Sequence, residues 1–150
     1  MDYRSAYVTV FARAGQLILL PLGQTEHGLQ VPVEPVIVLT DPTLRELVDG
    51  LSQSLQTSAV TVIPQPIWKS FRSPLYAAVG LKSERRFYPG TKACCVQTDD
   101  QASVAVCPIL WEKSGYREDL SKAVHLPATS ECKDVAEQVL AVIRTADVHP

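Results

Sequence analysis

The pair of side chains most typical of an enzyme is Glu26-His27, which lies in a loop bounded by two glycines. A histidine beside a carboxylate can act as a general base, and loops often carry functional groups. Catalysis also needs partner groups within reach, and the other two histidines fall elsewhere, at His125 in an expected strand and at His149 near the end of the sequence. We therefore interpret Glu26-His27 as part of a surface loop, and we expect no catalytic residue and no enzyme activity.

Cysteine is the other residue type that could do chemistry, and the sequence has four of them: Cys94, Cys95, Cys107 and Cys132. Their spacing contains no Cys-x-x-Cys pair, and the sequence has neither a His-x-His metal motif nor a glycine pattern that cradles phosphate. Cys94 and Cys95 are adjacent, so on a strand their side chains point to opposite faces and cannot join one site. We therefore expect buried free thiols, no metal and no cofactor.

Residues 68–92 form a basic strip, with six bases and one acid for a net charge of +5. The whole chain has 14 bases and 16 acids, so the remainder holds 8 bases and 15 acids and has a net charge of −7. Aromatic residues are interleaved with the bases, a pattern typical of single-strand nucleic-acid binding. An RNA-binding site would use Arg72, Lys82, Arg85, Arg86 and Lys92. The same bases can instead form a solvated face that balances the acidic remainder.

Acidic side chains gather further along the chain, where residues 98–120 hold five acids against two bases. They stand at an expected hairpin tip and in the loop after the next strand: Asp99, Asp100, Glu112, Glu118 and Asp119. Such a cluster can steer the protein toward a basic partner. Hairpin tips are also ordinarily polar, so solubility alone is the competing explanation.

The elements that must position these residues begin with a β-hairpin. Residues 6–12 have the alternating pattern of a half-buried strand, and residues 16–22 form an apolar run of strand length. A short turn with a glycine joins them. A proline-flanked strand is expected at 36–39. Thr40 or Asp41 then caps a helix with Pro42 in its first turn. Its apolar stripe is Leu44, Leu47, Val48, Leu51 and Leu55.

The second half of the sequence predicts five more strands, at residues 60–63, 75–79, 92–97, 103–109 and 123–126. Residues 82–89 and 111–119 are expected to be polar connections. Ser130 caps a last helix whose apolar stripe is Val135, Val139, Val142 and Ile143. Runs of strands with two helices predict one α+β domain over residues 1–150, a largely antiparallel β-sheet with two packed α-helices.

Composition agrees with one globular domain, because 46% of the 150 residues are apolar and 20% are charged. No apolar run approaches the ~20 residues of a membrane span. The first five residues lack the basic and long apolar regions of a secretory signal. We therefore expect a cytoplasmic protein that does not bind membranes.

Several marks in order along the chain carry a resemblance to a known family. Trp68-Lys69 is followed by Tyr-Ala-Ala-Val-Gly-Leu-Lys-Ser at residues 76–83, then by Phe87 and Lys92, and then by a strand pair ending in Val106-Cys107-Pro108. After Gly115-Tyr116, the strand Val124-His125-Leu126-Pro127 leads to the helix opened by Ser130. In this order the chain resembles the immunity proteins of bacterial contact-dependent growth inhibition (CDI) systems, which neutralise the toxin domain of a delivered exoprotein.

The resemblance implies a stoichiometric inhibitor of a cognate CDI toxin domain, a ribonuclease in many such systems, rather than an enzyme. The resemblance transfers no particular contact residues, because these interfaces are specific to each pair. We expect the five acids named above to contact the toxin on the ground of their charge, since carboxylates can mimic phosphate in a basic RNA cleft. The basic strip does not fit that mode of binding. An RNA-binding module that uses the strip is therefore the alternative hypothesis, and a small enzyme using Glu26 and His27 is the third.

Overall fold

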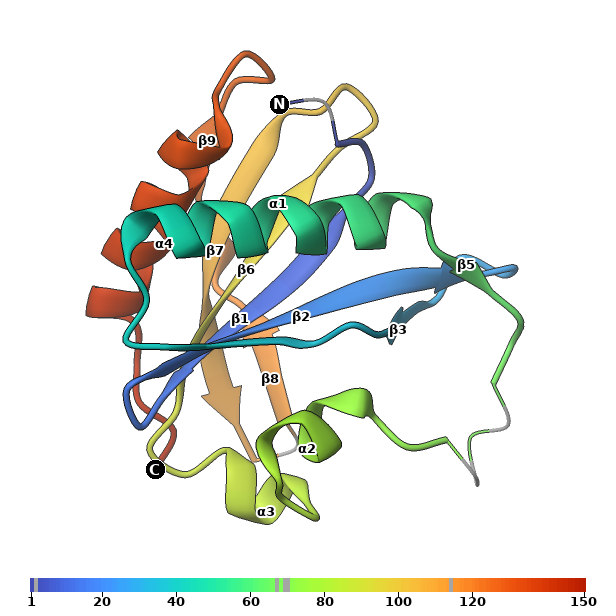
Figure 1. The fold of residues 1–150 in the computed structure, drawn as a ribbon, viewed down its shortest axis with the longest axis vertical. Coiled ribbons are helices and arrows are strands. Elements are labelled where there is room, and N and C mark those ends of the chain that lie inside the picture. The colour runs from blue at the N-terminus through green and yellow to red at the C-terminus, as the bar shows by residue number, and fades with distance from the viewer. Residues whose placement is uncertain (2, 67, 69–70, 114) are drawn as a thin grey trace.

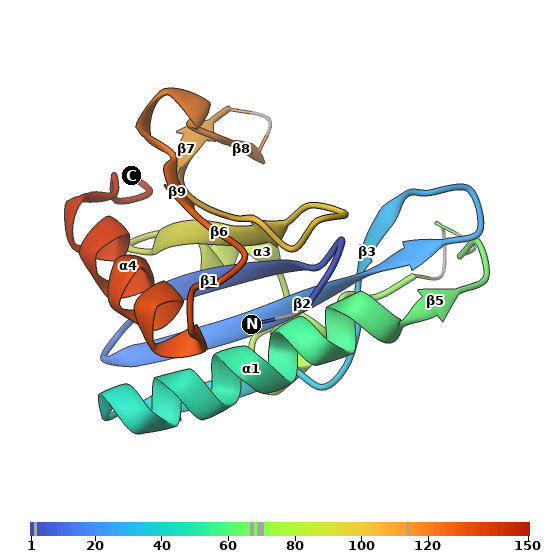
Figure 2. The same cartoon turned by 90° about the horizontal axis from the view of Figure 1, so that it is seen from above.

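The computed structural model describes residues 1, 3–66, 68, 71–113 and 115–150. The chain has an α+β fold in which a curled sheet carries two long helices on one face and two short helices on the other (Figures 1 and 2). The expected fold class, a largely antiparallel sheet with packed helices, is confirmed.

Six strands make the main path of the sheet, in the order β3-β2-β1-β6-β7-β8. They are β3 (Gln30–Pro32), β2 (Gln16–Thr25), β1 (Tyr7–Arg13), β6 (Lys92–Thr98), β7 (Val104–Glu112) and β8 (Gly115–Glu118). Three short strands lie off this path: β4 (Ile37–Thr40) and β5 (Val62–Ile63) pair with β2, and β9 (Val124–Leu126) pairs with β7. Over the described residues, every pairing is antiparallel except the parallel pairing of β2 with β5.

The long helix α1 (Leu44–Val60) begins two or three residues later than expected. Its N-cap is Thr43, whose hydroxyl accepts a hydrogen bond from the Glu46 backbone N–H at 3.2 Å. The Glu46 carboxylate reaches back to the Thr43 N–H, which completes a capping box. Neither Thr40 nor Asp41 is therefore the cap, and Pro42 precedes the helix instead of opening it.

The second long helix, α4 (Cys132–Thr145), is capped by Glu131 and not by Ser130. Glu131 and Asp134 form a reciprocal box in which the Asp134 carboxylate accepts from the Glu131 N–H at 2.9 Å. Ser130 is buried, and its carbonyl accepts from the N-terminal amine of Met1 at 3.0 Å. The backbone around Ser130 thus holds the start of the chain against α4.

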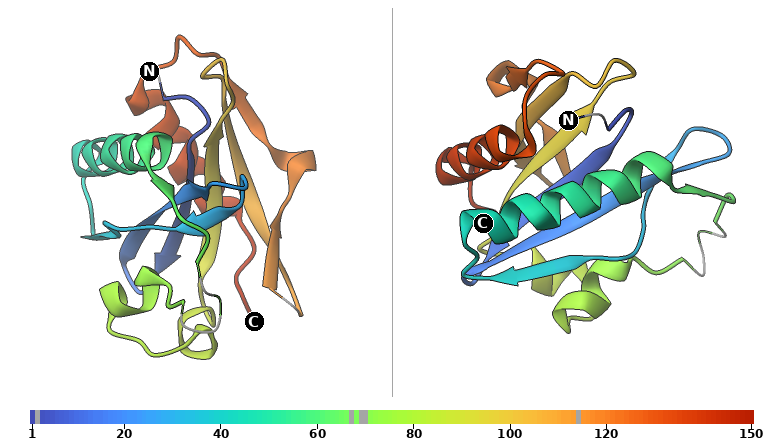
Figure 3. Two further views of the ribbon diagram at one scale, coloured as in Figure 1. Left: turned by 90° about the vertical axis from the view of Figure 1, so that its right-hand side faces the viewer. Right: turned by 45° about the horizontal axis from the view of Figure 1, so that its top comes forward.

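The alternation of each strand divides the core between the two faces of the sheet. Val8 and Val10 of β1 face α1 and α4, whereas Tyr7 and Phe11 face the other side. Figure 3 shows the two long helices together on one side of the strands. On the opposite side, apolar side chains from residues 75–88 cover the strands, and among them Phe87 is fully buried.

One prediction for this region was wrong. Residues 75–79 were expected to form a strand, but they belong to the helix α2 (Pro74–Val79). Ser73 caps the helix, Pro74 opens it and Gly80 ends it in the left-handed conformation at φ +71°. These are helix start and stop signals. A five-residue apolar run between them does not distinguish strand from helix by its period.

Two expected connections also contain regular structure. Residues 84–87 form the short helix α3 (Glu84–Phe87), and the one-turn 3-10 helix η1 (Leu120–Lys122) follows β8. β8 itself lies in the expected polar loop, where it pairs with the last four residues of β7. Searching the described residues for a helix long and apolar enough to cross a membrane finds none.

Candidate functional site

Aromatic rings from distant parts of the chain meet on the sheet face opposite α1 and α4. Tyr88 is at the centre: its ring centroid lies 5.2 Å from that of Trp111 and 6.1 Å from that of Tyr116. Phe11 and Phe87 meet edge to face at 5.0 Å beneath it. These rings come from β1, the end of α3, β7 and β8, so the curl of the sheet brings them together. Such edge-to-face pairs stabilise an apolar cluster beyond their buried area.

A hollow of about 320 Å³ opens beside this cluster, and we call it the aromatic hollow. Five aromatic side chains and one carboxylate, Glu84, dominate its lining. Its residues are Phe11, Leu20, Pro32, Phe71, Ser73, Leu75, Tyr76, Glu84, Tyr88, Gly115 and Tyr116. Tyr116 is 37% exposed, so this wall faces solvent as well as the hollow.

A second, wider hollow of about 500 Å³ adjoins the first, and we call it the basic hollow. It is lined by Phe71, Arg72, Ser73, Tyr76, Lys82, Ser83, Glu84 and Arg85. Phe71, Tyr76 and Glu84 line both hollows, so the two form one continuous concavity over α2 and α3. We refer to the two together as the α2–α3 surface.

The structure gathers three of the five bases expected to bind RNA, because Arg72, Lys82 and Arg85 all line the basic hollow. Arg86 is exposed on α3, where its carbonyl accepts from Arg13 Nη2 at 3.3 Å. Lys92 lies on β6 and donates from Nζ to the Arg144 carbonyl at 3.0 Å. Lys92 thus tethers the end of α4 and stands apart from the other three.

The five acids expected to contact a toxin do not form one patch. Residues 99 and 100 lie in the turn before β7, and Glu112 ends that strand. Eight residue steps along a strand separate the two ends of β7 by roughly 26 Å. Glu118 and Asp119 fall between these ends, opposite Ile109 and Pro108.

Four of these carboxylates already have partners in the fold. Asp99 Oδ1 accepts from the backbone N–H groups of residues 101 and 103 at 2.8 and 2.9 Å, which closes the turn. Glu112 pairs with Arg117, Glu118 accepts from the Tyr7 hydroxyl, and Asp119 caps η1. Asp100 is exposed and makes no recorded side-chain contact within the described residues. Whether these acids contact a toxin stays a prediction.

The Glu26-His27 pair lies in the turn that links β2 to β3. Both side chains are exposed, and the turn is closed by the Gly28 N–H donating to the Thr25 carbonyl at 2.9 Å. His125 is on β9 and His149 is near the C-terminus, so the structure does not bring the histidines together. Where residues are described, no group of three or more His, Cys, Asp or Glu side chains could hold a metal ion.

The cysteines are free thiols, and three of them are buried on strands. Cys94 faces the long helices and Cys95 faces the aromatic cluster, as their adjacency requires. Burial raises the pKa of Cys94 well above its ordinary value and that of Cys95 to about 12. Both stay protonated near neutral pH, so neither is an activated nucleophile.

The tyrosine hydroxyls on this face are hydrogen-bond donors at neutral pH. Burial is the largest cause that raises the pKa of Tyr88 to about 12, and it raises the pKa of Tyr7 and Tyr76 further. A hydrogen bond to Glu84 also contributes to the raised pKa of Tyr76. Glu84 is exposed and lies at the boundary of the two hollows.

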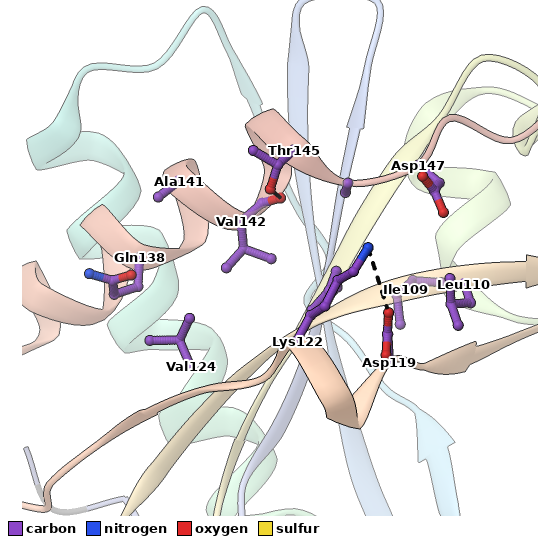
Figure 4. A pocket seen from close by; sticks show the side chains of 12 residues that line it. Ile109, Leu110, Asp119, Lys122, Val124, Gln138, Ala141, Val142, Thr145 and Asp147 are labelled. Atoms are coloured by element: carbon purple, nitrogen blue, oxygen red, sulfur yellow. Dashed lines mark hydrogen bonds and ion pairs between the residues drawn. The ribbon is translucent and has the colours of Figure 1, made fainter.

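A further hollow, of about 380 Å³, lies between α4 and the β7–η1 corner (Figure 4). Its two central charges face each other, with Lys122 Nζ 4.0 Å from Asp119 Oδ2. Asp119 Oδ1 accepts from the Ser121 hydroxyl at 2.6 Å, so this carboxylate stabilises the local turn. Lys122 and Asp119 are thus occupied with each other and with the local turn.

Comparison with known proteins finds relatives by shape alone. No protein-family model matches the chain, and no curated protein matches its sequence. A protein of unknown function from Neisseria meningitidis has a similar structure, with a TM-score of 0.72 and 13% identity, and the match covers 98% of both chains. A chain of a CdiA-CT/CdiI toxin and immunity complex from Yersinia pseudotuberculosis matches with a TM-score of 0.63 and 12% identity. That match covers 96% of this chain and 98% of the other.

At these identities the likeness establishes a shared fold over nearly the whole chain.

The sequence did not predict the aromatic cluster as a site, because Trp111, Tyr116 and His149 lie outside the basic strip in the sequence. Trp111 and Tyr116 face each other in the β7–β8 pairing. The His149 ring meets the Trp111 ring edge to face with centroids 4.9 Å apart, and backbone hydrogen bonds with residues 90 and 91 hold His149 in place. The one sequence feature that pointed to this cluster was Tyr116, an aromatic residue directly after Gly115.

Proposed function

We propose that this chain is a CDI immunity protein, which binds a cognate toxin domain in the cytoplasm and neutralises it as a stoichiometric inhibitor. The observation that carries the proposal is the match in shape to a chain of a CdiA-CT/CdiI toxin and immunity complex, over 96% of this chain and 98% of that one. The resemblance in the order of Trp, Gly and Pro marks supports the same family.

An inhibitor of this kind needs a rigid surface and no chemistry of its own. The two faces of the sheet are each packed into a core, and β1, β6 and β7 lie at the centre of both. Aromatic and arginine side chains are enriched where protein interfaces bind most strongly. This chain presents both types on the α2–α3 surface, and a ribonuclease toxin is the proposed target.

Growth protection tests the proposal directly. The C-terminal domain encoded by the toxin gene next to this chain's own gene is induced in bacteria, with and without this chain. We expect growth arrest without the chain and full growth with it. Protection should fail against a CDI toxin domain from another system, because such pairs are specific. Continued arrest in the presence of the folded chain would contradict the proposal.

RNA binding is the second candidate function, and one observation favours it. Arg72, Lys82 and Arg85 gather around Phe71 and Tyr76 in the basic hollow, which places cations beside stacking surfaces. This function predicts that the protein alone retards a labelled single-stranded RNA at low salt, with an affinity that falls steeply as salt rises. No retardation at low salt would exclude it.

A further inference from the structure

We propose that the α2–α3 surface docks an acidic segment of the cognate toxin domain, with carboxylates in the basic hollow and one apolar side chain in the aromatic hollow. This inference rests on the proposed function and names the surface and the chemistry of its interface. Of the acids expected to face the toxin, Asp99 and Asp100 lie in the turn before β7, and none of the five lines either hollow of the α2–α3 surface. Glu112 lies nearest, because it lines a neighbouring hollow together with Glu84 and Arg85.

The basic hollow is positively charged, which favours a partner with carboxylates. Three bases line it against one acid, Glu84. Lys82 and Arg85 are exposed, and neither forms an ion pair within the described part of the chain. The surrounding strip has a net charge of +5. The three bases attract the carboxylates of a partner, and such charge complementarity raises the rate of association.

The adjoining aromatic hollow supplies an anchor point. Its volume of about 320 Å³ suits one large side chain, and its walls include Phe71, Tyr76 and Tyr116. A side chain that is fully enclosed by such walls contributes more binding free energy than contacts at a wet rim. Phe71 and Tyr76 line both hollows, so neighbouring residues of a single segment can occupy the two.

Glu84 favours a protein segment over RNA as the occupant. Its carboxylate stands among the bases and lines both hollows, where it opposes a backbone with a phosphate at every nucleotide. A peptide segment instead offers N–H donors to that carboxylate. The rest of the molecule has a net charge of −7, which repels a long polyanion.

The acidic character of the docked segment indicates which part of the toxin this chain binds. A ribonuclease binds its substrate through a basic cleft, so an acidic segment of the toxin lies outside that cleft. The chain then blocks the toxin from beside its active site, and phosphate mimicry by this chain's acids plays no part in the contact.

The test compares two double variants that change the charge equally. Lys82→Glu/Arg85→Glu alters the basic hollow, whereas Arg45→Glu/Lys133→Glu alters exposed positions on α1 and α4, on the opposite face of the sheet. Association rates with the purified toxin domain encoded beside this gene are measured at low and high salt. We expect the first variant to associate about tenfold more slowly at low salt and the control less than about threefold, with the difference shrinking at high salt.

The anchor has its own variant. Phe71→Ala enlarges the shared wall of both hollows, and Phe71 is only half-buried, so the fold tolerates the change. We expect dissociation to become about tenfold faster with little change in the association rate. Circular dichroism and thermal melts of each variant establish that it is folded. A dissociation rate equal to that of the wild type would overturn the apolar anchor.

Three other outcomes would overturn the inference, and they are distinguishable. Equal association of the two double variants, with neutralisation intact, would reject the surface and leave the proposed function standing. Slower association of Asp100→Lys alone would move the interface to the acidic turn. Retardation of single-stranded RNA by the wild type, lost in Lys82→Glu/Arg85→Glu, would reassign the surface to RNA. No complex with wild-type protein would overturn the proposed function itself.

Discussion

The Tyr7 hydroxyl joins two parts of the sheet, because it donates a hydrogen bond from β1 to the Glu118 carboxylate on β8. Glu118 is half-buried, and Tyr7 is 7% exposed. Buried polar groups are costly when they lose a partner. The bond therefore fixes how far β8 curls over the second face, and with it the position of Tyr116 beside the aromatic hollow.

Tyr7→Phe should lower the free energy of unfolding by about 1–3 kcal/mol, because it leaves a half-buried carboxylate without its donor. The double variant with Glu118→Gln, whose neutral amide costs less to leave unpaired, should lose less stability than the two single changes together. Urea titrations measure both. Additive losses would show that the two side chains do not interact.

Alkaline pH should destabilise the protein, because burial raises the pKa of Cys95 from an ordinary 9.0 to about 12. As the pH rises, the unfolded thiol loses its proton first, so the unfolded state is favoured. The contribution of this thiol is therefore complete below pH 9.0 and is lost as the pH rises toward about 12. Burial raises the pKa of Cys94 and Cys107 in the same direction.

Urea unfolding between about pH 8 and about pH 11 measures this effect. The free energy of unfolding should decrease across that range, and Cys95→Ala should make the decrease shallower. A free energy that stays constant or increases would contradict the assignment of buried, protonated thiols.

Elements with long periodic patterns were predictable from the sequence, as were the short strands β4 and β9, but other short elements were not. In α1 and β1, apolar residues recur at regular spacing over several residues. The tight turn before β2 is recognisable by its glycine. α2, α3 and β8 have four to six residues each, too few for a period to be read. The α2–α3 surface depends on all three, so its bases were visible in the sequence and its walls were not.

The start of α1 offers a direct comparison between the expected and the observed cap. Thr43→Ala should lower the free energy of unfolding by about 1 kcal/mol, because it removes the hydroxyl that accepts from the Glu46 N–H. Thr40→Ala is the matched control, since Thr40 is exposed and does not cap the helix. Thermal melts compare the two. An equal or larger loss for Thr40→Ala would contradict the assigned cap.

The whole chain divides its charge along the sequence, with a net charge of +5 over residues 68–92 and −7 over the remainder. That division was already present in the sequence, but the sequence alone placed the toxin contacts on the acids. The fold separates those acids and uses four of the five carboxylates for its own turns, pairs and caps. Three bases of the strip, Arg72, Lys82 and Arg85, in contrast line one hollow beside aromatic side chains.

Titration of the purified toxin domain with this chain, followed by calorimetry and by loss of toxin activity, tests the central claim most directly. We expect saturation at one chain per toxin domain, with activity lost at the same ratio and a dissociation constant of nanomolar order or tighter. Absence of binding, or binding that leaves the toxin fully active, would contradict the account of this chain as an immunity protein.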